Sequence, residues 1–177
     1  MVGDGPRHLV LVGLMGAGKT SVGARCAEAL GRHFVDTDEL VEAAAGNTVS
    51  EIFVAEGEGG FRARERIAVA DACASPEPLV IACGGGAVVD PQNRAAIRER
   101  GAVVWLRGTP QHLAERVGAG AGRPLLDDRA PAETLERLAA LRAAAYEAAA
   151  HVTIDTDGIG VDEIASRVLQ ELASCIG

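Results

Sequence analysis

The feature that most constrains the fold is the segment 13–20, Gly-Leu-Met-Gly-Ala-Gly-Lys-Thr, which fits the pattern G-x-x-x-x-G-K-[ST]. Its glycines permit a tight turn whose backbone N–H groups can face a phosphate. Lys19 supplies a positive charge for the outer phosphates of a nucleotide, and the Thr20 hydroxyl can ligate Mg²⁺. A chance glycine-rich turn would lack the required setting. Here an apolar run, 8–12, precedes the segment and a helical pattern, 21–30, follows it.

The rest of the chain alternates short apolar runs with helical patterns. Strands are predicted at 8–12, 33–35, 78–83, 102–106 and 152–154, and helices at 21–30, 39–45, 48–55, about 61–74, 91–100, 110–116, 131–150 and 161–173. This alternation predicts an α/β protein with the three-layer fold of the P-loop NTPases, a five-stranded parallel sheet flanked by helices. We expect one domain over residues 1–177, with a substrate-binding segment at about 37–65.

A glycine-rich segment at about 118–130 has neither helical nor strand periodicity and carries Arg123. A plain surface loop would share this composition, but a mobile lid explains why a basic residue lies among hinge glycines. We therefore expect a lid there.

Composition excludes several classes of function. The net charge of −8 and the aromatic content of 3% argue against a nucleic-acid partner, which needs a basic surface or stacking platforms. No stretch is long and apolar enough to span a bilayer, and the N-terminus has no signal-peptide pattern, so no membrane partner is expected. The four cysteines form no C-x-x-C pair. Reduced thiols in a cytoplasmic protein are the simplest interpretation, and we expect a monomer.

Acidic residues and glycines follow two more of the predicted strands. Asp36 and Asp38 lie two residues apart at the end of the second strand, and both can face a ligand at the carboxyl end of the sheet. A helix N-cap would need only one of them. The third strand runs into residues 84–86, three glycines, where other phosphate-loop proteins carry a metal-binding aspartate. Three glycines suggest that a ligand approaches the backbone closely, although a flexible turn is the alternative.

Six motifs in this order give the sequence a close resemblance to the shikimate kinase family, from about residue 8 to 174. The motifs are the segment 13–20, Asp36-Thr37-Asp38, Phe61-Arg62-x-x-Glu65, Gly84-Gly85-Gly86, Arg123-Pro124-Leu125-Leu126 and Arg142-x-x-x-Tyr146. The phosphate loop alone is unspecific, and the arginine–glutamate pair alone would suit an exposed helix start. The combination is specific to the family.

The resemblance implies transfer of the γ-phosphoryl group of ATP to the 3-hydroxyl of shikimate, in the biosynthesis of chorismate and aromatic amino acids. Its implied partners are shikimate, ATP and ADP, with Mg²⁺ as cofactor. The implied catalytic residues are Lys19, Asp38 and Arg123. The implied ATP-binding residues are Gly13, Met15, Gly16, Ala17, Gly18, Lys19, Thr20, Ser21, Arg116 and Arg123. The implied shikimate-binding residues are Asp38, Arg62, Gly84, Gly85, Gly86 and Arg142, and the implied metal-binding residues are Thr20 and Asp36.

Two positions depart from the family pattern. Cys83 stands before the glycines where Thr, Leu or a small residue is more usual, and residues 143–145 are alanines where the family has x-Pro-Leu. Neither removes a charged group. The resemblance therefore predicts the charged residues of the substrate pocket, but it does not define which side chains form the wall of the pocket near these positions.

Three other functions compete with this interpretation. A kinase for another hydroxylated acceptor, such as gluconate, would share the phosphate loop but would not need the other motifs together. A nucleotide-binding switch has no use for two arginines that grip a carboxylate, and the guanine-specific Asn-Lys-x-Asp is absent. A relative that has lost turnover is disfavoured because every expected catalytic residue type is present.

The resemblance generates a prediction about Arg123. If it closes over the phosphates as an arginine finger does, Arg123→Ala should lower kcat on the order of 10³-fold. Steady-state kinetics of the purified variant measure this, and near-normal turnover would remove the role from Arg123.

Overall fold

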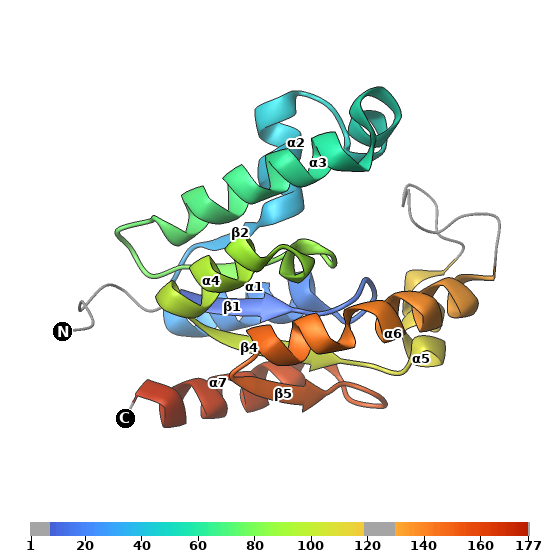
Figure 1. Cartoon of the computed structure of the whole chain (residues 1–177). Helices are drawn as coiled ribbons and strands as arrows, with labels where there is room; N and C mark the ends of the chain where they lie inside the picture. Colours follow the sequence, from blue (N-terminus) through green and yellow to red (C-terminus); the bar gives the residue numbers. More distant parts are fainter. Residues whose placement is uncertain (1–7, 119–129, 177) are drawn as a thin grey trace.

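The computed structural model describes residues 8–118 and 130–176. Its centre is a five-stranded parallel sheet in the order β2-β3-β1-β4-β5 (Figure 1). The strands are β1 (His8–Val12), β2 (Phe34–Asp36), β3 (Val80–Ala82), β4 (Gly101–Arg107) and β5 (Val152–Asp155). The predicted parallel sheet is confirmed, and each predicted strand is present with bounds shifted by at most a few residues.

Helices cover both faces of the sheet. In the described part of the chain they are α1 (Lys19–Leu30), α2 (Thr37–Ala45), α3 (Val49–Cys73), α4 (Pro91–Arg100), α5 (Pro110–Val117), α6 (Pro131–Ala149) and α7 (Val161–Ile176), with a short 3₁₀ turn, η1, at Ala87–Val89. Helices α1 and α7 pack together on one face, and α4 and α6 pack together on the other (Figure 1). The α2–α3 pair stands to one side of the sheet, beyond its β2 edge.

Local sequence explains the shape of α3. Thr48 and Glu51 form a capping box: the Thr48 hydroxyl accepts from the Glu51 N–H, and the Glu51 carboxylate accepts from the Thr48 N–H. The prediction of two helices, 48–55 and about 61–74, agrees with the structure, because the span labelled α3 consists of two helical stretches that meet at a break at Gly57. Gly57 has a φ of 70°, a conformation that suits glycine and lets the chain change direction between the two helical stretches.

The core is built from aliphatic residues, as the low aromatic content requires. All five residues of β1 are buried, because helices cover the sheet on both faces. The three cysteines whose side chains are described, Cys26, Cys73 and Cys83, are buried and unpaired by disulfides. Within the described residues, no helix is both long and apolar enough to cross a membrane.

His8 is a polar residue inside this core. Its side chain is 1% exposed. Nδ1 accepts a hydrogen bond of 3.0 Å from the Leu79 N–H, so Nε2 carries the proton and donates to the Cys73 carbonyl at 3.2 Å. The neutral ring thus joins β1 to the last residue of α3 and to the residue before β3. Burial lowers the pKa of His8 below its usual value.

We predict that His8 makes the stability of the fold depend on pH. Because the pKa of His8 is lower in the folded state than in the unfolded state, the unfolded chain binds a proton first as the pH falls below about 6.5. The free energy of unfolding should therefore be constant with respect to His8 above about pH 6.5 and should decrease below it, by at most about 1.4 kcal/mol per pH unit. Urea unfolding of wild type and His8→Asn at pH 7.5 and 5.5 measures this. The variant should lose less stability on acidification than wild type.

The matched control is His33→Asn, because His33 is exposed. It should show the pH dependence of wild type. Equal losses in the His8→Asn and wild-type proteins would contradict the assignment of the effect to His8.

Candidate functional site

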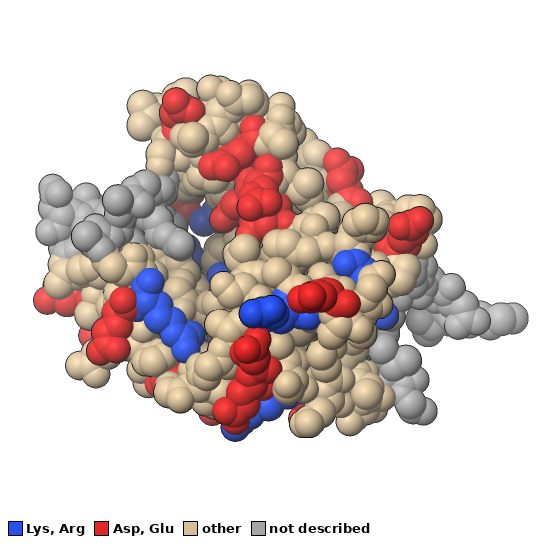
Figure 2. Space-filling model, turned by 180° about the vertical axis from the view of Figure 1, so that it is seen from behind, with Lys and Arg blue, Asp and Glu red and all other residues tan. Residues whose placement is uncertain are grey.

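A cavity of about 740 Å³ lies at the carboxyl ends of β1, β2 and β3. In the space-filling view it is seen as a hollow below the α2–α3 pair, with basic side chains inside it (Figure 2). Most of the predicted site residues line it: Met15, Gly16, Gly18, Lys19, Thr20, Ser21, Asp36, Asp38, Arg62, Gly84, Gly85, Gly86, Arg116 and Arg142. Gly13 and Ala17 lie in the same loop but are buried beneath its surface. The structure therefore brings distant parts of the chain to one place.

The phosphate loop between β1 and α1 has the backbone that its glycines predict. Gly13, Gly16 and Gly18 have φ values of 150°, 82° and 88°. A Cβ at Gly16 would lie 2.7 Å from the Leu113 carbonyl oxygen, so the loop packs against α5 at a distance that only glycine allows. Gly18 caps α1 without a side-chain hydrogen bond. The first N–H groups of the helix are thus without a side-chain cap and suit an anion.

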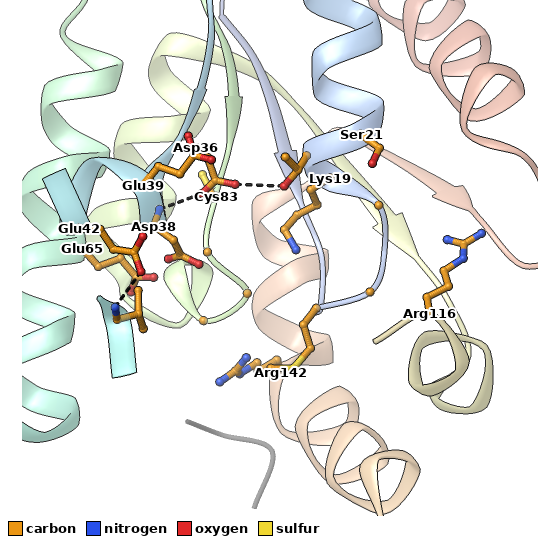
Figure 3. A pocket seen from close by; sticks show the side chains of 18 of the residues that line it. Lys19, Ser21, Asp36, Asp38, Glu39, Glu42, Glu65, Cys83, Arg116 and Arg142 are labelled. Atoms are coloured by element: carbon orange, nitrogen blue, oxygen red, sulfur yellow. Dashed lines mark hydrogen bonds between the residues drawn. The ribbon is translucent and has the colours of Figure 1, made fainter. Parts of the chain in front are cut away.

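Lys19 is the first residue of α1 and bends back over the loop. Its Nζ donates to the carbonyl oxygens of Gly13 at 2.8 Å and Leu14 at 3.0 Å. In Figure 3 the ammonium group points into the cavity, toward the side that carries Asp38. A phosphate bound at the loop would meet this charge directly.

Thr20 and Asp36 bring oxygen atoms together across α1 and β2. The Thr20 hydroxyl donates to Asp36 Oδ2 at 3.2 Å, while Asp36 Oδ1 accepts from the Asp38 N–H at 2.9 Å (Figure 3). A hydroxyl and a carboxylate at an exposed position fit Mg²⁺, which prefers oxygen ligands and keeps several waters. Within the residues described, no cluster of three or more His, Cys, Asp or Glu side chains forms a dedicated metal cage. The donor pair therefore suits an ion shared with a nucleotide.

Asp36, and not Asp38, caps helix α2. This leaves the Asp38 carboxylate free for another role. Its Oδ1 atom is buried and has no hydrogen-bond partner. Burial, reinforced by the nearby Asp36 and Glu65 carboxylates, raises the pKa of Asp38 to about 6. Such a group is a strong acceptor near neutral pH and still lacks a donor.

Gly84 lies between two of these carboxylates. A Cβ there would be 2.6 Å from Asp38 Oδ1 and 2.7 Å from Glu65 Oε1, too close for any other residue without a shift. The Gly84 N–H donates to the Thr37 hydroxyl at 2.9 Å. Gly86 lies under the guanidinium of Arg62 in the same way, without room for a side chain. Glycines at 84 and 86 therefore keep these charged groups in their places, since a side chain at either position would displace one of them.

Arg62 is held in place by two glutamates of its own helix. Nη1 donates to Glu65 Oε2 at 2.6 Å and Nη2 to Glu58 Oε1 at 3.4 Å. Glu65 is 1% exposed, its Oε1 has no partner, and burial raises its pKa despite the adjacent arginine. The contacts with Glu58 and Glu65 leave part of the Arg62 guanidinium facing the cavity, where it can bind an anion.

Arg142 reaches the cavity from α6 and is 6% exposed. A Cβ at Gly85 would lie 3.6 Å from its Nη1. Arg116 lies on the far side of the phosphate loop (Figure 3), where Nη2 donates to the carbonyl oxygens of Thr156 at 3.1 Å and Ile159 at 3.3 Å. The two arginines thus lie on opposite sides of the phosphate loop (Figure 3).

Several lining residues were absent from the predicted site: Glu39, Glu42, Val49, Phe53, Phe61, Glu65, Cys83, Ile159, Gly160 and Val161. Glu65 had a signal, because it lies three residues after Arg62 on one helix. Phe53 and Phe61 pack with ring centroids 4.9 Å apart and form an apolar wall that spans the kink of α3. No local pattern predicts that contact. Arg123 and residues 119–129 of the predicted lid lie outside the described residues.

The fold and this site define a nucleotide-binding protein of the P-loop class, with an acceptor site beside its phosphate loop. The family model described as shikimate kinase matches residues 15–173. A shikimate kinase from Symbiobacterium thermophilum is 51% identical over 167 residues, which cover 93% of this chain and 95% of the relative. The chain belongs to the shikimate kinase family.

Solved structures agree. The chain superposes on a shikimate kinase from Acinetobacter baumannii in complex with shikimate, with a TM-score of 0.92, 38% identity and coverage of 96% of this chain and 94% of that one. A gluconokinase from Sinorhizobium meliloti 1021 is less similar, with a TM-score of 0.63, 25% identity and coverage of 96% and 93%. The fold class is confirmed, and the comparison favours shikimate kinase over the gluconate alternative.

The geometry predicts how Asp38 titrates. Glu65→Gln removes a nearby negative charge and frees Arg62, so the pKa of Asp38 should fall from about 6. Carboxyl ¹³C NMR of the ligand-free protein measures this shift. Glu58→Gln is the matched control, because Glu58 also pairs with Arg62 but its side chain is 60% exposed; it should leave the pKa of Asp38 nearly unchanged. An unchanged or higher value in Glu65→Gln would contradict the proposed coupling.

Proposed function

We propose that this protein transfers the γ-phosphoryl group of ATP to the 3-hydroxyl of shikimate, giving shikimate 3-phosphate and ADP. The observation that carries the proposal is the buried, unpartnered Oδ1 of Asp38, which lies between a phosphate loop and two cavity-lining arginines. Family membership and the match to a shikimate complex support this assignment. ATP would occupy the phosphate-loop end of the cavity and shikimate the end near α2 and α3.

The nucleotide half of the reaction rests on the backbone of the phosphate loop. Its N–H groups and the N-terminus of α1 would bind the phosphates, and Lys19 would exchange its two carbonyl partners for phosphate oxygens. Arg116 fixes the segment around Thr156 and Ile159, beside the place for the adenine. These contacts hold the γ-phosphorus in line for attack and stabilise the charge that spreads over its oxygens.

Mg²⁺ is proposed as the cofactor, held by Thr20 and, through water, by Asp36. When bound, the ion neutralises phosphate charge. The short distance between the two side-chain oxygens supports this placement.

The acceptor half rests on side chains from three separate segments. Arg62 and Arg142 would bind the shikimate carboxylate through paired hydrogen bonds, and the glycine turn 84–86 would contact the ring through its backbone. Asp38 Oδ1 would accept the hydrogen bond of the 3-hydroxyl, orient it toward the γ-phosphorus and take its proton as the P–O bond forms. A pKa of about 6 keeps Asp38 largely ionised at neutral pH and so ready to act.

The predicted lid would complete the site. Closure of the segment 118–130 would exclude water, which otherwise competes with shikimate for the phosphoryl group, and would bring Arg123 to the phosphates. This remains a prediction from sequence. We also propose that the enzyme is a cytoplasmic monomer that acts in aromatic amino-acid biosynthesis. The three described cysteines, which form no disulfide, support a reducing compartment.

The direct test measures ADP formation from ATP and Mg²⁺ with shikimate, with gluconate and without an acceptor. Release that depends on shikimate is expected. Release with gluconate alone would show a different sugar-acid kinase, and release without any acceptor would show an ATPase or a nucleotide switch.

A matched pair of arginine variants tests the acceptor half. Arg62→Ala should raise the KM for shikimate by about 10²-fold, because a charged hydrogen-bond donor is lost, and should leave the KM for ATP unchanged. Arg64→Ala is the control, since Arg64 lies on the same helix but pairs outward with Glu56. It should leave both KM values unchanged. Loss of ATP binding with normal shikimate binding in Arg62→Ala would contradict the assignment.

A further inference from the structure

Tyr146 lies directly behind the proposed acceptor site without lining its cavity. It is the chain's single tyrosine and is 1% exposed. It follows Arg142 by four residues on α6, so the two side chains share one face of the helix. A buried phenol needs a partner for its hydroxyl, and here the partner belongs to the site.

The hydroxyl of Tyr146 joins two groups of the site. It donates a hydrogen bond to the Gly85 carbonyl oxygen, and the positively charged Arg142 guanidinium lies beside it. One oxygen atom thus contacts both an arginine of the site and the peptide at the centre of the glycine turn. Burial raises the pKa of Tyr146 above its usual value, so the hydroxyl keeps its proton and remains a donor at neutral pH.

The ring of Tyr146 is itself fixed by the sheet. It stacks on Trp105 of β4, with centroids 5.2 Å apart and an interplanar angle of 14°. Arg107 covers the Trp105 ring, with Cζ 5.5 Å from its centroid. Because β4 is paired with β1 and β5, this stack holds the phenol on a rigid element.

Gly85 is where the two halves of the site meet. The position of a Cβ at Gly85 is 3.6 Å from each of three atoms: the Gly13 carbonyl oxygen, the Met15 backbone nitrogen and Arg142 Nη1. The first two belong to the phosphate loop. A small movement of the Gly85 peptide would therefore change the spacing between the acceptor groups and the loop.

We propose that Tyr146 is a positioning residue for the acceptor: its hydroxyl sets the orientation of Arg142 and of the glycine turn that shikimate contacts. This inference rests on the proposed function, because it assigns Arg142 and residues 84–86 to the acceptor. Tyr146 itself touches neither the acceptor nor the nucleotide. Loss of the Tyr146 hydroxyl should weaken acceptor binding and misalign the 3-hydroxyl of shikimate, and should leave the affinity for the nucleotide unchanged.

The test replaces Tyr146 by Phe, which keeps the stack on Trp105 and removes only the hydroxyl. The KM for shikimate should rise about tenfold, the size of one hydrogen bond to a charged group, while the KM for ATP stays within about twofold of wild type. Trp105 is the chain's single tryptophan and stacks on residue 146, so its fluorescence gives a direct titration with shikimate. The Kd from fluorescence should rise by the same factor as the KM.

Thr134→Val is the matched control, because it removes another buried hydroxyl from α6 at a residue outside the cavity lining. It should leave both KM values unchanged even if it lowers the melting temperature. If Tyr146→Phe behaves like this control, or if it raises the KM for ATP as much as that for shikimate, the role is only structural and the inference is overturned.

A double-mutant cycle separates action through Arg142 from a general effect. In an Arg142→Lys background the added change Tyr146→Phe should raise the KM for shikimate by less than it does in wild type, because the guanidinium beside the hydroxyl has been replaced. Strictly additive effects would show that Tyr146 does not act through Arg142. Failure of the proposed function is distinct, since wild type would then form no ADP in response to shikimate.

Discussion

The pairing of β1 with β3 and β4 decides where the groups of the site lie. Leu11 is in register with Ala82, Ala82 is in register with Asp36, and Val12 is in register with Trp105. Because the strands are parallel, the chain leaves the sheet at the same level after each of them. The phosphate loop, the first turn of α2 and the glycine turn therefore open onto one edge, and buried aliphatic strands that take no part in chemistry hold them there.

This placement brings carboxylates and arginines together in the cavity, and some of their polar atoms have no hydrogen-bond partner within the part of the chain that the structure describes. Two partly or wholly buried carboxylates, Asp38 and Glu65, each retain an oxygen without a partner, while Arg62 and Arg142 stand beside them. Unpaired buried oxygens reduce stability, and among the described residues these two are the only buried side-chain oxygens without a partner. Such a cost is expected at a functional site, where an acceptor molecule with hydroxyls and a carboxylate would supply the missing donors and the anion. The glycines at 84 and 86 leave room for these charged groups, since a side chain at either position would displace one of them.

Sequence reasoning predicted the sheet and the phosphate loop because their signals are local. A strand, a glycine-rich loop and a helix follow one another within residues 8–30, and the periodicity of each is visible without knowledge of the remainder. The division of α3 into two helical stretches was also predicted, because the glycine-rich segment 56–60 separates two helical patterns, and Gly57 is the residue that leaves the helical conformation. The identity of the α2 cap was left open between two aspartates, and the three-dimensional position of Asp36 resolves it.

The acceptor side could be predicted only through resemblance, for a physical reason. The phosphate loop binds its ligand largely with its own backbone, so one short segment carries both the geometry and the signal. The acceptor groups come from α2, α3, the turn after β3 and α6, and none of these segments has a meaning of its own in isolation. Contacts that join them, such as Gly84 with Thr37 or Tyr146 with Gly85, depend on packing between distant elements. The part of such a site that binds its ligand through the backbone can therefore be predicted from a single sequence. The part that binds through side chains from several segments can be predicted only when the fold is known.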